Sequence, residues 1–400
     1  MFSHESHKEA LPMKFFKSII ILLAAIVLLA ACNSGNDGNG EPYEYDADVY
    51  DEIDEEYYPE AATDNNETDE PTSANDDTEY PEEAEEEPPE LSEEEQQLVA
   101  EMAHFLAMLQ SIWDEDNGTM WGIPLHVPIV LVCGDTQLAV ANRPSWQRDF
   151  VPQYVDGNLV YVGTRRPVGF YVYVNWDGVD GVIWSWQYIQ SSIYAGGLED
   201  ILRTIFHTGF HAIQMELMGF RGAGMEGLSD SNDAWISFGL EANALIQALK
   251  STGEERLAII HDALSIRDAR RQASRTAADA ENWLKISEGT TTYTDLHLVL
   301  APDEAVYFII DRLRVVMEES YDSPLGAAVS TAIGFAYVGG AAYGILLDAV
   351  GAEWRPYVDR YTDLGLMLKE ALGISEFIPL DEINLERYGY SEVVAMITNT

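Results

Sequence analysis

Cysteine and basic residues are both scarce in this chain of 400 residues. The only two cysteines are Cys32 and Cys133, so no disulfide framework can be read from the sequence. Lysine and arginine number 22 against 69 aspartate and glutamate residues, which gives a formal net charge of −47. Because proteins bind nucleic-acid phosphates through clustered lysine and arginine, this imbalance argues against a nucleic-acid binder.

The acidic residues are concentrated in one segment. Residues 33–95 contain 27 of them and no lysine or arginine. Such a segment cannot bury enough apolar surface to offset chain entropy, and its like charges repel one another. We therefore expect residues 32–95 to form an extended, disordered tether. The remaining residues 96–400 are rich in apolar side chains and long enough to build a large core.

The N-terminus has the organisation of a secretory signal, which we assign to residues 1–31. Starting from Met13, two lysines precede an apolar run, Ile19 to Leu29, that is too short to span a bilayer. The following Leu-Ala-Ala-Cys resembles the lipobox of bacterial lipoproteins. This resemblance implies cleavage before Cys32 and a lipid anchor on its thiol, at the extracytoplasmic face of the cell membrane. The first twelve residues fit no signal, so Met1 and Met13 both remain possible starts.

The body of the chain predicts an α+β fold. A capping box, Ser92 with Glu95, begins an amphipathic helix that ends near Asn117. Short β-rich runs follow and predict an antiparallel meander, with strands at 128–133, 137–141, 159–163, 169–174 and 181–186. Cys133 is expected to pack there as a small buried hydrophobe. From Leu198 the pattern is helical, with predicted helices at 199–217, 233–250, 254–267, 277–293, 302–319, 341–349 and 354–372. Strands followed by helices indicate α+β, with parts at 96–197 and 198–400.

A histidine pair is the first candidate for chemistry. His207 and His211 are four residues apart in a predicted helix, so both imidazoles lie on one face and can reach a single ion. Downstream, Glu288 stands at the end of an apolar-periodic helical stretch, directly before Gly289.

With these residues the chain resembles the gluzincins, the thermolysin-like zinc metallopeptidases. That family carries His-Glu-x-x-His on one helix and a third ligand in a later Glu-Gly-x-x-x-Tyr segment. The chain is most similar to a bacterial branch whose further motifs match 211–214 (HAIQ), 240–245 (LEANAL) and 337–348 (YVGGAAYGILLD). The resemblance runs from about residue 121 to 373. It implies a zincin-like fold and a zinc ion held by His207, His211 and Glu288.

Several other residues compete for roles at this site. Glu241 is the alternative third ligand or a partner of the histidines, and Glu281 is a second candidate for such a partner. Tyr343 is a candidate for the phenol that stabilises an oxyanion in some zincins. Packing of a small-residue helix explains its surroundings equally well. The basic cluster at 267–275 is expected on a solvated helix face, paired with the protein's own acids.

The departure from the family motif decides the functional prediction. Thr208 occupies the position of the usual glutamate, the general base that takes a proton from the zinc-bound water. A threonine hydroxyl cannot accept and pass on that proton, and loss of a general base costs about 100- to 10,000-fold in rate. The metal can remain while turnover is lost.

Three interpretations follow. The first is a cell-surface lipoprotein with a degenerate, metallopeptidase-like domain that acts as a binding or scaffolding module and can still hold zinc. The second is an active zinc peptidase or hydrolase with another base, Glu216 or Asp295, and with residues 182–187 as the edge strand that aligns substrate. The third is a metal-free receptor that binds peptides or glycans through tryptophans 146, 176, 184 and 186. The substrate, the protein partner and the oligomeric state are not encoded in any motif that we recognise.

Overall fold

The computed structural model describes residues 91–144, 150–176, 178–219, 227–229, 231–320 and 327–398. The expected signal, the lipid site at Cys32, the tether up to residue 90 and Trp146 lie outside the described residues. Residues 88–400 form one compact unit. Its elements are α+β in composition, as the sequence predicts.

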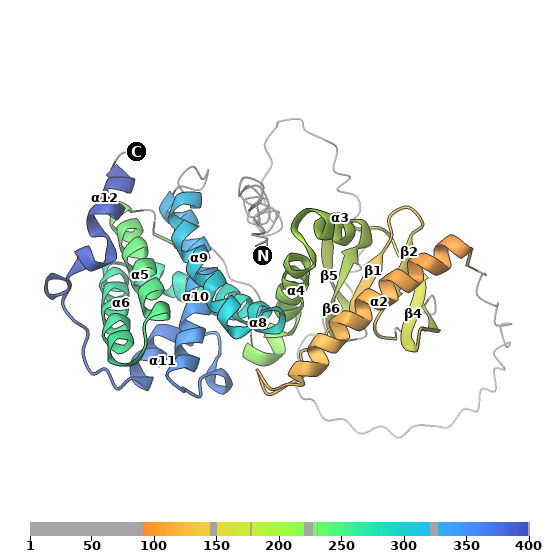
Figure 1. Cartoon of the computed structure of the whole chain (residues 1–400), viewed down its shortest axis with the longest axis horizontal. Coiled ribbons are helices and arrows are strands. Elements are labelled where there is room, and N and C mark those ends of the chain that lie inside the picture. Colours follow the sequence, from red (N-terminus) through yellow and green to blue (C-terminus); the bar gives the residue numbers. More distant parts are fainter. Residues whose placement is uncertain are drawn as a thin grey trace, which may run out of the picture. The chain divides into compact units, whose positions relative to one another are not determined.

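The first described helix follows the predicted signals closely. Helix α2 spans Glu93–Asp116, and the Ser92–Glu95 capping box is present with both reciprocal hydrogen bonds. The helix ends where Asn117 adopts a left-handed conformation, at φ 43°. Because α2 begins at Glu93, the last residues assigned to the tether belong to this helix. Its apolar face packs on strands of the sheet (Figure 1).

The sheet is mixed, so the prediction of an antiparallel meander is wrong. Its six strands lie in the order β3-β4-β2-β1-β6-β5, and β1 pairs with β6 in parallel. The physical reason is visible in β1, whose four residues are apolar and all buried. A strand buried on both faces favours a central position with neighbours on each side, whereas a meander would leave this first strand at the edge. The strands are β1 Ile129–Val132, β2 Leu138–Ala141, β3 Val151–Val155, β4 Asn158–Thr164, β5 Tyr171–Trp176 and β6 Val179–Ser185.

The sheet order also corrects the predicted edge strand. Strand β6 lies between β1 and β5, so residues 182–185 are internal, and Trp186 already begins helix α3, Trp186–Gly196. The edge strand on that side is β5. Strand β3, the other edge, and helix α3 were not predicted. Cys133 is buried directly after β1 and its sulfur accepts a hydrogen bond from Gln187, in agreement with a packing role.

The second half is helical, as predicted, with several changes of boundary. Helix α10 begins fourteen residues before its predicted start at 341, and the helix predicted over 354–372 is a 3-10 turn followed by the short α11. The elements are α4 Leu198–Met218, α5 Asn232–Lys250, α6 Gly253–Ala273, α7 Arg275–Leu284, a π-helical turn η2 Lys285–Gly289, α8 Thr290–Val299, α9 Pro302–Ser320, α10 Ala327–Ala349, η3 Arg355–Tyr357, α11 Leu364–Ala371, η4 Leu380–Glu382, η5 Leu385–Tyr388 and α12 Tyr390–Thr398.

Helix α10 is the central helix of this half. Among the described residues, its segment Val329–Ala349 is the one long and apolar enough to cross a membrane by length and composition. Its most apolar 18-residue window is 72% buried within the protein, where α10 packs on α5, α8, α9 and η2. This burial is that of a core helix.

A buried charge network stabilises the same region. Arg270 of α6 contacts Glu241 at 2.6 Å and Glu281 at 2.9 Å, and Lys285 contacts Glu241 at 3.2 Å. Arg267 and Arg271 pair with Asp363. The basic cluster does pair with the protein's own acids, but Arg267 and Arg270 are buried, so the expectation of a solvated helix face is wrong. The arginines neutralise carboxylates inside the core.

The Asp363 ion pairs predict an acid-sensitive fold. Burial opposes ionisation of Asp363, but Arg267 and Arg271 outweigh it and lower its pKa to about 2 from the ordinary 3.8. Because the pKa is lower in the folded chain, this stabilisation is full above about pH 4 and is lost as the pH falls toward 2. Asp363→Asn removes this carboxyl. Between about pH 4 and pH 2 we therefore expect the free energy of unfolding of the variant to fall by on the order of 2 kcal/mol less than that of the wild-type protein.

Urea denaturation at several pH values between 2 and 5 measures this effect. Asp381→Asn, at an exposed position, is the control and should keep the wild-type pH dependence. An unchanged pH dependence in Asp363→Asn would show that the ion pairs do not contribute to acid unfolding.

Candidate metal centre

The histidine pair lies on α4, a helix held between the sheet and the second half of the chain. Ile205, Phe206 and Phe210 are buried, and α4 packs on β6 on one side and on α8 on another. These buried residues lie on one side of α4, so the imidazoles of His207 and His211 share the opposite, partly exposed side. Their ring centroids are 4.9 Å apart.

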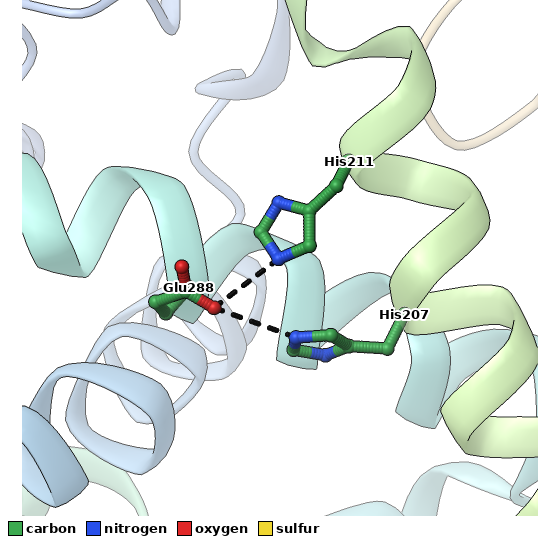
Figure 2. Close-up of side chains that lie close together, drawn as sticks. All are labelled: His207, His211 and Glu288. Atoms are coloured by element: carbon green, nitrogen blue, oxygen red, sulfur yellow. Dashed lines mark hydrogen bonds and ion pairs between the residues drawn. The ribbon is translucent and has the colours of Figure 1, made fainter. Parts of the chain in front are cut away.

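Glu288 completes a group of three convergent side chains. Its Oε2 atom lies 3.4 Å from Nε2 of His207 and 3.2 Å from Nε2 of His211 (Figure 2). The three ligand atoms all lie within 4.8 Å of one another. Ligands about 2.1 Å from a tetrahedral zinc ion are separated by ~3.4 Å, so two nitrogen atoms and one oxygen atom already stand at suitable spacing. The described residues therefore fit the predicted two-histidine, one-glutamate set.

A π-helical turn places Glu288 there. Residues Lys285–Gly289 form η2, which interrupts the predicted helix between α7 and α8. Within this turn Glu288 faces the histidines while Lys285 contacts Glu241 in the core. Gly289 permits close packing on α10, since a Cβ atom on it would lie 2.5 Å from the Cα of Gly340. Single π turns are frequent at functional sites because they redirect one side chain within a helix.

Polar partners hold both imidazoles in one orientation. Nδ1 of His207 lies 3.0 Å from the Asp295 carboxylate, which also accepts from Arg203. Nδ1 of His211 lies 2.8 Å from Oε1 of Gln214. The amide nitrogen of Gln214 donates to the Ser287 carbonyl, so its oxygen is the atom that faces His211. With both Nδ1 atoms donating, the Nε2 atoms are directed at Glu288, which is how outer partners orient metal-binding histidines.

The electrostatics of the three groups couple protons to metal binding. Burial would lower the pKa of His207, but its hydrogen bonds to Asp295 and Glu288 outweigh burial and raise the pKa to about 9. Burial likewise opposes ionisation of Glu288, yet the neighbouring histidines hold its pKa well below the ordinary value. Without a metal, His207 is therefore a cation paired with a carboxylate at neutral pH. A metal ion must displace this proton, so its affinity falls as the pH decreases.

Thr208 and Gly209, between the histidines, have structural explanations. The Thr208 hydroxyl donates to the Thr204 carbonyl at 2.9 Å, and the residue is buried. A Cβ atom on Gly209 would lie 3.2 Å from Val127, so this position favours the smallest residue. The glycine weakens α4 by about 1 kcal/mol relative to alanine, and close packing of the helix accounts for its presence.

Other predicted site residues lie elsewhere. Glu241, the alternative ligand, forms ion pairs with Arg270 and Lys285. It also accepts a hydrogen bond from the Tyr343 hydroxyl at 2.8 Å. The structure therefore brings Glu288, and not Glu241, to the histidines. Glu281 bonds Arg270, so it is no partner of the imidazoles. Tyr343 is fully buried in this network and does not face the ligand set.

The structure also gives the candidate bases and the tryptophans surroundings that differ from those their predicted roles require. Asp295 orients His207, and Glu216 is exposed on α4. Trp176, Trp184 and Trp186 are all buried, so they cannot form a surface platform for glycans. Trp176 and Trp184 on the strands and Trp186 at the start of α3 fill the core, as large aromatic side chains commonly do.

Sequence reasoning missed part of the site. It quoted Gln214 as part of a motif and Asp295 as a possible base, but assigned neither to an imidazole. Gln214 is findable from spacing, because it lies three residues after His211 on the same helical face. Tyr337, whose ring stacks on His207 with centroids 5.7 Å apart, begins the 337–348 motif on α10, but no local pattern assigns it to the histidines.

The role of Asp295 gives a direct prediction for metal affinity. We expect Asp295→Ala to weaken zinc binding by about 10- to 100-fold, because His207 would lose the acceptor that fixes its orientation. A chelator-competition titration of zinc measures the effect, with Asp303→Ala, an exposed aspartate on α9, as the matched control. Wild-type affinity in Asp295→Ala would contradict the assigned role.

Comparison with known proteins finds no relative of this chain. No protein-family model matches the chain, no curated protein matches it significantly, and no solved structure does so. The resemblance to gluzincins therefore stays a prediction that rests on the sequence motifs.

Proposed function

We propose that this chain is a lipid-anchored, extracytoplasmic protein whose folded domain holds a zinc ion at His207, His211 and Glu288. The domain resembles a gluzincin peptidase but acts as a binding or scaffolding module. Its ligand is a peptide or protein at the cell surface. Zinc supplies an electrophilic centre with one coordination position open to a ligand.

One observation carries the metal assignment. Both Nδ1 atoms of the histidine pair are hydrogen-bonded to side-chain oxygens, so both Nε2 atoms converge on one oxygen of Glu288. In metal sites a hydrogen bond from the second ring nitrogen commonly fixes the orientation of each coordinating imidazole and raises the affinity for the ion.

The absence of a motif glutamate supports binding over turnover. The hydroxyl of Thr208 is used by the helix backbone, and the carboxylate of Asp295 is used by His207 and Arg203. Neither group is free to take a proton from a water molecule beside the ligand set. The three side chains can therefore bind a metal ion that in turn binds a ligand. The glutamate that serves as general base for peptide hydrolysis in the gluzincins is replaced by Thr208.

The missing base predicts the outcome of a hydrolysis assay. With a broad fluorogenic peptide library, we expect no measurable cleavage by the zinc-loaded wild-type protein. Thr208→Glu should raise cleavage by at least about 100-fold over background, because it restores a carboxylate next to the first ligand. Thr252→Glu, at the N-terminus of α6, is the control for an added charge. Cleavage by the wild-type protein that disappears in His211→Ala would establish an active peptidase and overturn the proposal.

The lipid anchor is tested separately. We expect the wild-type protein to be in the membrane fraction and Cys32→Ala to be released or left unprocessed, because the acidic segment provides no attraction to anionic lipid headgroups. Cys133→Ala is the matched control, since Cys133 is buried in the folded domain. Unchanged processing and membrane association of Cys32→Ala would refute the lipoprotein assignment.

A further inference from the structure

Three tyrosines stand beside the histidine–glutamate set. Tyr337 comes from α10, and Tyr171 and Tyr173 come from the edge strand β5. The Tyr337 ring lies parallel to His207, with centroids 5.7 Å apart and an interplanar angle of 11°, and its phenol interacts electrostatically with Glu288. Two elements far apart in the sequence thus bring phenol groups to the same place.

The three phenols form one continuous group. The rings of Tyr171 and Tyr173 are in contact, with centroids 5.6 Å apart, and Tyr171 interacts electrostatically with Glu288. The Tyr173 hydroxyl donates to the Thr208 carbonyl at 3.5 Å, a long bond that a better acceptor can replace. Tyr337 interacts electrostatically with both strand tyrosines. The group therefore extends from Glu288 to the backbone between the two histidines.

These phenols are neutral donors. The phenol group of a tyrosine ordinarily has a pKa of about 10, well above neutral pH. At neutral pH the hydroxyl groups keep their protons and donate hydrogen bonds to an electron-rich oxygen. Because Asp295 is engaged by His207 and Arg203, these neutral donors favour the retention of an anion over the activation of water.

We propose that Tyr171, Tyr173 and Tyr337, together with the His207–His211–Glu288 set, bind the carboxylate group of a ligand. This inference rests on the proposed zinc site and names the chemistry of its ligand. The phenols donate hydrogen bonds to the carboxylate oxygens beside the open coordination position.

Charge selects a carboxylate over other groups. A divalent ion with Glu288 leaves one positive charge, because the charge of Asp295 is balanced by Arg203 at 2.9 Å. A monoanion neutralises this charge, whereas a phosphate dianion would leave an uncompensated negative charge in a partly buried site. A neutral amide would leave the positive charge without a partner.

The site is accessible to a group at the end of a chain. The His207 side chain keeps 22% of its surface exposed and Tyr173 keeps 38%, while Glu288 keeps 11%. Tyr173 lies on an edge strand, so a ligand can approach without displacing an element of the sheet. A peptide C-terminus and a small free carboxylic acid both have the required chemistry.

Titration calorimetry on the full-length, zinc-loaded protein tests the proposal. The probes are tetra-alanine with a free C-terminus, its C-terminal amide, acetate and inorganic phosphate. Zinc content is measured on each sample by elemental mass spectrometry. The variant is Tyr171→Phe with Tyr337→Phe, and Tyr194→Phe is the control because Tyr194 is 95% exposed.

We expect tetra-alanine to bind, its amide and phosphate to bind at least about tenfold more weakly, and the double variant to lose at least about tenfold in affinity at unchanged zinc content. Binding of acetate as well would show that the carboxylate alone suffices. If tetra-alanine binds and acetate does not, the bound carboxylate is that of a peptide C-terminus and not that of a small free acid. Equal binding of the amide, or wild-type affinity in the double variant, would overturn the proposal. A wild-type protein that takes up no zinc would instead refute the metal site itself.

Discussion

The π-helical turn from Lys285 to Gly289 is the constraint on which the second half of the structure depends. One end of this turn places the Lys285 ammonium group in the core against Glu241. The other end places Glu288 against the histidines of α4. Gly289 lets α10 approach closely enough to bury the turn and to bring Tyr337 over His207. The core and the candidate site therefore share one turn, and a change in either affects the other.

Burial of so many charges makes this arrangement costly unless each has a partner. Burial lowers the pKa of Lys285 to about 8, and its proximity to Glu241 only partly offsets that effect. The carboxyl of Glu241 has the opposite balance, since the charges of Arg270, Lys285 and Arg267 outweigh burial and lower its pKa to about 2. Removal of one partner from such a network commonly costs 3–5 kcal/mol, because the remaining charge stays buried. The network thus rigidifies the framework around Glu288.

Local patterns in the sequence predicted the elements better than their assembly. The spacing of His207 and His211 and the Glu288-Gly289 pair led to the three convergent side chains, because helical periodicity determines which side chains share a face. The parallel pairing of β1 with β6 joins strands about fifty residues apart and has no local signature. Tyr337 and the strand tyrosines reach the site only through tertiary packing. The sequence also leaves Glu241 as an alternative ligand, because its ion pairs with Arg270 and Lys285 depend on the tertiary fold.

The central claim is that His207, His211 and Glu288 hold one zinc ion directly. X-ray absorption spectroscopy at the zinc edge, on full-length protein purified without chelator, measures the ligand set. The account predicts about one zinc ion per chain, with two imidazole nitrogen atoms and one carboxylate oxygen near 2.0–2.1 Å. A protein without zinc, or zinc surrounded only by water and carboxylate oxygen atoms of the acidic segment, would contradict it.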